Sequence, residues 1–298
     1  MPSCDKLFLL VTFLFCALAC DKKQSAPTTK SSQQGKITVV SLSPAATDLI
    51  LAMGGAEQLV GVSTFDDDPA IKSLPKVGDY ENVDWERIIQ LRPQKMIVQM
   101  KRDRIPLGMK QRASELDISL VTVQIDRFAD VIVEINHLGM ELNRKDESKK
   151  LFESLREEVD EIRRMWEESP KVRTLIVTND DGTGIAGAET YLNDCLEYAS
   201  GENVAKDHKG YFKADREMLI TMKPDVIVQL LPDATPAQLD EAKKFWQSLP
   251  TIPAVVNDRI LVITEPWALR PNAKLGELTR KISAFLHPGT STGQETNP

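Results

Sequence analysis

The chain has 298 residues, of which 42% are hydrophobic and 27% are charged. These values exclude an extensively disordered chain and predict about two domain-sized units. A formal net charge of -7 argues against nucleic acid as a partner. Only Cys195 lies outside the first 20 residues, which excludes a disulfide framework and a four-cysteine metal site in the body of the protein.

The N-terminus has the pattern of an export signal. A short polar start is followed by the apolar run 7–18, which has the length of a signal-peptide core and is too short to span a membrane. The run ends in Leu-Ala-Cys at residues 18–20, which resembles a bacterial lipobox, in which the cysteine is diacylated and becomes the mature N-terminus. We therefore expect a signal peptide at 1–19 and lipidation of Cys20 as the only membrane attachment.

Two polar segments frame the body. Residues 20–36 lack large apolar side chains and are predicted to form a lipidated tether, with a reach of about 20 Å. Residues 289–298 are predicted to be a disordered tail. Between them, strand-like and helix-like segments alternate, which is typical of α/β units with parallel sheets. The predicted strands are 37–42, 95–99, 118–123, 172–178, 225–230 and 259–263.

A long helix is predicted at residues 147–168, near the middle of the chain. Its apolar residues form one narrow stripe in a charged background, and its length would be about 33 Å. The stripe consists of Leu151, Leu155, Val159, Ile162 and Trp166. We interpret this helix as a rigid part of a connector at 127–170 between an N-terminal lobe at 37–126 and a C-terminal lobe at 171–288. The alternative is an ordinary covering helix of one large domain.

The two halves share a short pattern. Residues 84–93 and 215–224 both begin with Asp, carry Glu two positions later, and end in Pro before a strand. Such repetition predicts two similar lobes, and a cleft between lobes is a common ligand site.

Sequence motifs for catalysis are missing. The chain has no Gly-x-Ser-x-Gly elbow, Walker loop or His-Glu-x-x-His, and its three histidines are scattered. Cys195 is interpreted as a buried apolar residue. The run 182–187 matches the dinucleotide pattern G-x-G-x-x-G, but acidic residues precede it, and we expect a flexible loop at the cleft mouth.

An ordered string of motifs resembles the substrate-binding proteins that receive cobalamin or ferric siderophores for ABC importers. The resemblance covers residues from about 37 to 288. It is carried by SLSPAATD at 41–48, LPKVGDY at 74–80, SGENVA at 200–205, PDVI at 224–227, WQSLP at 246–250 and PAVV at 253–256.

This resemblance implies two α/β lobes joined by a backbone helix, with the ligand held in the cleft between them. It also implies a binding protein that performs no chemistry, needs no cofactor and acts as a monomer in the periplasm or at the cell surface. Positions matching cleft-facing residues of the family are Phe65, Tyr80, Tyr211 and Trp267, with Lys101, Arg102 and Arg270 placed to meet ligand carboxylates or phosphate. Glu86 and Glu217 match the glutamates that dock onto the two permease subunits in the inner membrane.

The ligand is left open among chelated metals. We place a corrinoid first, a ferric siderophore second and haem third. The run Asp66-Asp67-Asp68 predicts an acidic cleft rim, which disfavours an anionic catecholate. Free Zn²⁺ or Mn²⁺ is disfavoured because the histidines that such sites use are missing. The alternative from another class is an exported α/β enzyme.

Overall fold

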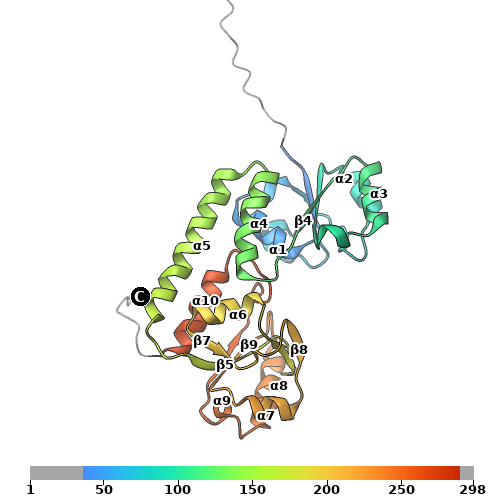
Figure 1. The fold of residues 1–298 in the computed structure, drawn as a ribbon. Helices are drawn as coiled ribbons and strands as arrows, with labels where there is room; N and C mark the ends of the chain where they lie inside the picture. Colours follow the sequence, from blue (N-terminus) through green and yellow to red (C-terminus); the bar gives the residue numbers. More distant parts are fainter. Residues whose placement is uncertain (1–35, 289–298) are drawn as a thin grey trace, which may run out of the picture. The chain divides into compact units, whose positions relative to one another are not determined.

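The computed structural model describes residues 36–288, and its helices and strands lie in the unit that begins at Ile37. This unit contains two β-sheets, each with its own helices, and a long helix beside them (Figure 1). The predicted fold class, two α/β lobes joined through a long helix, is therefore confirmed. The predicted signal peptide, Cys20 and most of both terminal segments lie outside the described residues.

The first sheet has four strands in the order β2-β1-β3-β4, and all of its pairs are parallel. Its central strands are buried because both faces are covered, as parallel sheets require. The predicted strand 95–99 is matched without shift. The strands are β1 (Val39–Ser41), β2 (Leu59–Gly61), β3 (Lys95–Gln99) and β4 (Ser119–Val123).

Short helices connect these strands. The predicted start of the first helix is confirmed, because the Ser43 side chain accepts a hydrogen bond from Ala46 N at 3.2 Å and Pro44 occupies the first turn. The helices are α1 (Pro44–Ala52), η1 (Ala56–Gln58), η2 (Pro69–Ile71), α2 (Trp85–Leu91), η3 (Arg102–Arg104) and α3 (Leu107–Glu115).

The second sheet has six strands and is mixed, which corrects the prediction of parallel sheets only. Strand β6 pairs antiparallel with both β5 and β8. Gly184 begins β6, so the segment expected to be a flexible loop is instead a strand of this sheet. The strands are β5 (Val172–Val177), β6 (Gly184–Ala186), β7 (Gly201–Asn203), β8 (Tyr211–Lys213), β9 (Val226–Leu230) and β10 (Ile260–Ile263).

The helices of the second lobe pack around this sheet, with α10 beside α6. Cys195 of α6 is fully buried, as predicted. The helices are α6 (Tyr191–Tyr198), α7 (Arg216–Met222), α8 (Pro236–Gln247), α9 (Pro253–Val256) and α10 (Leu275–Leu286).

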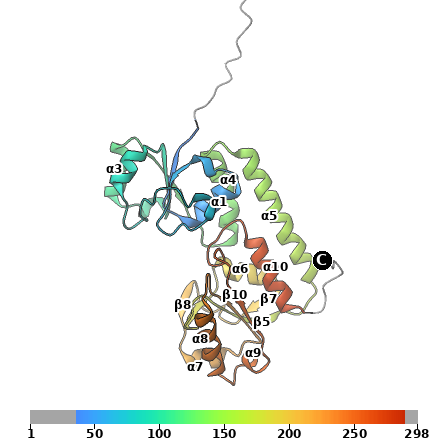
Figure 2. The ribbon, with the colours of Figure 1, turned by 180° about the vertical axis from the view of Figure 1, so that it is seen from behind.

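The segment predicted to be a connector contains α4 (Phe128–Glu141) and α5 (Lys145–Trp166). The long helix begins and ends two residues earlier than predicted, and most of the predicted apolar stripe is buried. Figures 1 and 2 both show α5 running beside α4 and α10. Close approach of α4 and α5 requires Gly139, because a Cβ there would lie 2.3 Å from Ser148 Oγ.

An ion pair with a buried carboxylate joins the start of α4 to α6 of the second lobe. Arg127, which precedes α4, donates from Nε to both Asp194 oxygens at 3.1 and 2.8 Å and from Nη2 to Oδ1. Phe128 N also donates to Asp194 at 2.9 Å. The Asp194 side chain is only 6% exposed, so these donors compensate a carboxylate that has lost its water.

Replacement of Arg127 by Ala should therefore leave a buried, undercompensated carboxylate. We expect the free energy of unfolding to fall by about 3 kcal/mol in urea titrations. Arg112→Ala is the control, because its ion pair with Glu115 is exposed and its loss should cost less than about 1 kcal/mol. Equal effects of the two variants would contradict the structural role of Arg127.

Candidate ligand cleft

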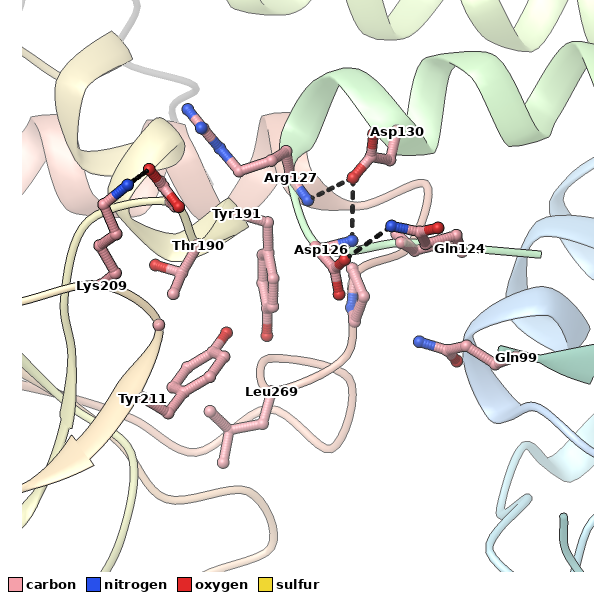
Figure 3. A pocket seen from close by; sticks show the side chains of 14 residues that line it. Gln99, Gln124, Asp126, Arg127, Asp130, Thr190, Tyr191, Lys209, Tyr211 and Leu269 are labelled. Carbon is pink, nitrogen blue, oxygen red and sulfur yellow. Dashed lines mark hydrogen bonds and ion pairs between the residues drawn. The ribbon is translucent and has the colours of Figure 1, made fainter. Parts of the chain in front are cut away.

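A cavity of about 840 Å³ lies between the two lobes. The last residue of β3 and the residues after β4 line one side, and the start of α6, strand β8 and the loop 264–274 line the other (Figure 3). The carboxyl ends of β3 and β4 therefore face the cavity, which is where ligands bind in open α/β sheets. The lining residues are Gln99, Gln124, Ile125, Asp126, Arg127, Asp130, Glu189, Thr190, Tyr191, Lys209, Gly210, Tyr211, Leu269 and Pro271.

Two glutamine amides contribute to this cavity from the first lobe. Ser43 donates to Gln99 Oε1 at 2.7 Å, which fixes that oxygen and leaves the amide nitrogen on the cavity side (Figure 3). Gln124 Nε2 donates to Asp126 at 3.1 Å. The lobe therefore presents amide and carboxylate groups that can form hydrogen bonds with a polar ligand edge.

Both cations of the cavity are already paired. Arg127 is held by Asp194, and Lys209 Nζ lies 2.5 Å from Glu189 Oε1. Asp126 and Asp130 line the cavity as well, and one Asp130 oxygen accepts from the backbone N–H groups of Asp126 and Arg127. The cavity therefore offers no excess positive charge to a polyanionic ligand.

Two tyrosines form the aromatic part of the lining. Tyr191 is 4% exposed and Tyr211 is 54% exposed, and their hydroxyl groups point toward each other (Figure 3). Burial raises the pKa of Tyr191 well above its usual range, so its phenol is neutral. Tyr191 N donates to Asp126 O at 2.8 Å, which ties this aromatic pair to the first lobe.

The loop 264–274 separates this cavity from a second one of about 450 Å³. Leu269 and Pro271 line the first cavity, whereas Trp267 and Arg270 line the second. Lys274 Nζ lies 5.3 Å from the centroid of the Trp267 ring. The loop can therefore present side chains to both parts of the cleft.

Arg270 bridges the lobes instead of standing free for a ligand. Its Nη1 donates to Asp67 Oδ1 at 2.7 Å, and its Nε lies 3.2 Å from Asp48 Oδ2 without hydrogen-bond geometry. Asn272 Nδ2 donates to the same Asp48 oxygen at 3.2 Å. We predicted that Arg270 meets ligand carboxylates. In the structure its guanidinium pairs with Asp48 and Asp67, so a ligand carboxylate would have to compete with these two side chains.

Phe65 and Tyr80 lie on two adjoining loops of the first lobe and are 66% and 48% exposed. The loops are joined by a hydrogen bond of 2.9 Å from Thr64 N to Gly78 O. Gly78 has φ +88°, and a Cβ at this position would lie 1.9 Å from Asn82 O, so the turn before Tyr80 requires glycine. Through Asp67 and Arg270, the same region is tied to the loop that carries Trp267.

The remaining predicted residues lie elsewhere. Lys101 and Arg102 are exposed at η3, and Arg102 lines a separate cavity beside the edge strand β4. The inter-lobe cavity therefore includes Tyr211 but neither of these two cations. Glu86 and Glu217 are exposed at the second positions of α2 and α7.

The prediction of an acidic rim at residues 66–68 is wrong for Asp66, whereas Asp67 and Asp68 line the second cavity. Asp66 is 5% exposed, and its Oδ2 accepts from Ser63 N at 2.7 Å and from Thr47 Oγ1 at 3.2 Å. Asp67 is paired with Arg270. A run of charged residues usually lies in solvent, and its sequence gave no sign that one carboxylate is buried.

Sequence reasoning missed most of the residues that line the inter-lobe cavity from the first lobe. Gln99 and Gln124 belong to no sequence motif that signals a site. Only their position at the carboxyl ends of predicted parallel strands could have indicated that they line a ligand cavity. Arg127 and Tyr191 become site residues through contacts between segments far apart in the chain.

The part of the chain that the structure describes has neither a helix that could span a membrane nor a cluster of metal-binding side chains. Within residues 36–288, no helix combines the length and apolarity needed to cross a membrane. The same residues contain no group of three or more His, Cys, Asp or Glu side chains arranged to hold a metal ion.

Comparison with known proteins identifies the family. The periplasmic binding protein family model matches residues 39–266, so the chain belongs to this family of binding proteins. The chain is 24% identical over 258 residues to YvrC, an uncharacterized ABC transporter substrate-binding lipoprotein of Bacillus subtilis, covering 85% of this chain and 80% of YvrC. The family confirms the predicted resemblance and the prediction of a binding protein rather than an enzyme.

Two further proteins extend the comparison. A vitamin B12-binding protein of Yersinia pestis is 24% identical over 239 residues, which are 80% of this chain and 81% of that protein. The structure of the periplasmic heme-binding protein HutB of Vibrio cholerae matches with a TM-score of 0.74 and 22% identity, covering 85% of this chain and 100% of that one. The structural match shows a shared fold.

The buried Asp66 makes a prediction about pH. Burial disfavours its charged form and raises the pKa of this carboxyl from 3.8 to about 6. Between these values the folded protein retains a proton that the unfolded chain has lost, so this group lowers the free energy of unfolding as pH rises. Asp66→Asn should remove up to about 3 kcal/mol of that fall in urea titrations from about pH 4 to pH 7.

Asp103→Asn is the control for this experiment, because it removes an exposed carboxylate from the same lobe. We expect Asp66→Asn to change the pH slope more than this control does. Equal slopes in all three proteins would contradict the assignment of a raised pKa to Asp66.

Proposed function

We propose that this protein is a receptor that captures a chelated metal between its lobes and delivers it to an ABC permease. The family and the inter-lobe cavity support a binding role, and the relatives include an ABC transporter substrate-binding lipoprotein and a vitamin B12-binding protein. The cavity volume of about 840 Å³ lies in the range of sites for sizeable organic ligands.

A corrinoid is the favoured ligand because of the charge of the cavity. Arg127 and Lys209 are already ion-paired, and further carboxylates line the same space. A corrinoid presents many uncharged amide groups at its edge, which can pair with Gln99 and Gln124 without displacing an ion pair. A ferric siderophore and haem follow in that order, since anionic groups on either ligand would meet carboxylates.

The aromatic contacts are proposed to come from Phe65, Tyr80, Tyr211 and Trp267. Aromatic faces bury a large area with few torsions to fix, which suits a flat chelate. Tyr211 lines the main cavity, and Trp267 belongs to the loop that borders it. Phe65 and Tyr80 stand exposed on the linked loops of the first lobe, where a bound ligand could cover them.

The test of this proposal begins with the ultraviolet and visible spectrum of protein purified from cells supplied with cyanocobalamin, haemin or a ferric siderophore. A corrinoid spectrum in the protein fraction is expected. Calorimetric titration with cyanocobalamin should then show weaker binding by Tyr80→Ala, Tyr211→Ala and Trp267→Ala, by about 1–3 kcal/mol for each anchor. Leu107→Ala is the control, because Leu107 is 70% exposed outside these loops.

Failure of all three chelates to bind would overturn the proposed ligand class. Binding of haemin or the siderophore alone would change the ligand within that class. Unchanged cyanocobalamin affinity in all three aromatic variants would remove these residues from the proposed site.

The proposed anchor is a diacyl lipid on Cys20, consistent with the lipobox-like run 18–20 and with the name of the Bacillus relative. The acyl chains would hold the protein at the membrane surface through the tether at 20–36. Intact-mass measurement of the membrane-bound form tests this point, since cleavage elsewhere without acyl chains would contradict it.

Docking is proposed to use Glu86 and Glu217, one from each lobe. Each follows an Asp N-cap, and an acidic residue in this turn stabilises a helix by about 0.3–1 kcal/mol. This helix stabilisation explains why a glutamate suits each position separately. It does not explain why both lobes carry a glutamate at the same position of equivalent helices. Paired charges on two lobes suit a permease of two subunits, where they would set orientation and speed encounter.

The double variant Glu86→Ala with Glu217→Ala should lose uptake of radiolabelled cyanocobalamin while keeping its calorimetric affinity in the purified protein. Docking should also weaken as salt rises, because exposed charges are screened. Normal uptake would contradict the docking role, and lost ligand affinity would place the two acids in ligand binding instead.

A further inference from the structure

Helices α2 and α7 have the same local structure in the two lobes. Each has seven residues and an Asp N-cap, with Arg87 N donating to Asp84 at 3.0 Å and Met218 N donating to Asp215 at 2.8 Å. Each ends at a residue with positive φ, 48° at Arg92 and 46° at Lys223. The helices are therefore equivalent in structure, not only in sequence.

The equivalence extends to an exposed isoleucine. Three residues after Glu86, Ile89 is 39% exposed, and three residues after Glu217, Ile220 is 38% exposed. The preceding residues, Ile88 and Leu219, are fully buried and hold each helix to its lobe. The exposed isoleucines are therefore not needed to complete either core.

Each glutamate and its isoleucine share one helix face. Residues three apart on a helix have Cβ atoms about 5–6 Å from each other. Neither Glu86 nor Glu217 has an ion-pair partner among the described residues. Nearby cations are occupied elsewhere, since Arg87 pairs with Asp84 and Arg216 donates to Ser248 O at 3.0 Å.

We infer that each docking contact is composite, consisting of an unpaired glutamate and an isoleucine one turn along the same helix. This inference rests on the proposed function. The partner is a membrane permease whose two subunits each present a cation beside an apolar surface. A single exposed isoleucine is ordinary on a protein surface, but the same pair on both lobes fits one partner with a duplicated site.

The two components act differently. The glutamates attract the partner over a distance and depend on salt, whereas the isoleucines contribute only once water has left the contact. Loss of the isoleucines should therefore weaken docking at every salt concentration. The double variant Ile89→Ser with Ile220→Ser should lower uptake of radiolabelled cyanocobalamin by about tenfold at subsaturating concentration.

The control is Val133→Ser with Met140→Ser, which removes two more exposed apolar side chains, 61% and 63% exposed, from α4. We expect normal uptake from this control. Both double variants should retain the circular dichroism spectrum and the cyanocobalamin affinity of the original protein. A tenfold loss in the control as well would overturn the inference, because any exposed apolar residue would then suffice.

A second experiment tests the docking contact directly by photo-crosslinking. It uses the full-length protein, carrying a photo-reactive amino acid, in its own cells. Placed at 89 and, separately, at 220, it should form adducts with the membrane subunit of one ABC permease, identified by mass spectrometry. Placed at 133, it should not. Adducts with a second copy of this chain or with a soluble protein would overturn the inference.

The glutamate variant separates the two possible failures. The composite contact is wrong and the proposed function stands if Glu86→Ala with Glu217→Ala abolishes uptake, Ile89→Ser with Ile220→Ser transports normally, and the photo-reactive residue at 89 or 220 forms no adduct. If both variants transport normally, docking through these helices is wrong, and the inference fails with it.

Discussion

Burial of the Asp194 carboxylate is the constraint on which the cleft depends. A carboxylate that is only 6% exposed is costly unless donors surround it, and those donors come from the segment that enters α4. Arg127 therefore has to lie against α6. The same segment contributes Gln124 and Asp126 to the cavity, so the ion pair between this segment and α6 also fixes the position of cavity-lining groups.

A second contact between the lobes, at Arg270, has less complete hydrogen bonding than the contact at Arg127. Arg270 faces Asp48 and Asp67, yet its Nε lacks a hydrogen bond with good geometry. Burial raises the pKa of Asp48, and Arg270 only partly opposes that effect. Desolvation therefore offsets part of the attraction between Arg270 and Asp48 at this junction.

The sequence predicted the parts of the fold that have a periodic signal. The buried strand 95–99 and the long amphipathic helix were placed within two residues, since their apolar patterns follow from burial. Strands β2, β6, β7 and β8 have three residues each, too few for a period to appear, and they were missed. The site was harder: Tyr211 was indicated by the family resemblance, whereas nothing in the sequence indicated that Gln99 lines the cavity with its amide held by Ser43.

Arg127 and Lys209 are already ion-paired, and this raises the free energy needed to bind an anionic ligand in the cavity. A polyanionic chelate could recruit Arg127 or Lys209 only by competing with Asp194 or Glu189. Competition with Glu189 is inexpensive because both partners are exposed, but taking Arg127 would uncover a buried carboxylate. An uncharged, amide-bearing ligand avoids this cost, because it can use the hydrogen-bonding groups of Gln99, Gln124 and Tyr211 while every ion pair stays intact. The ion pair that holds Arg127 against α6 thus also raises the cost of binding a polyanion in this cavity.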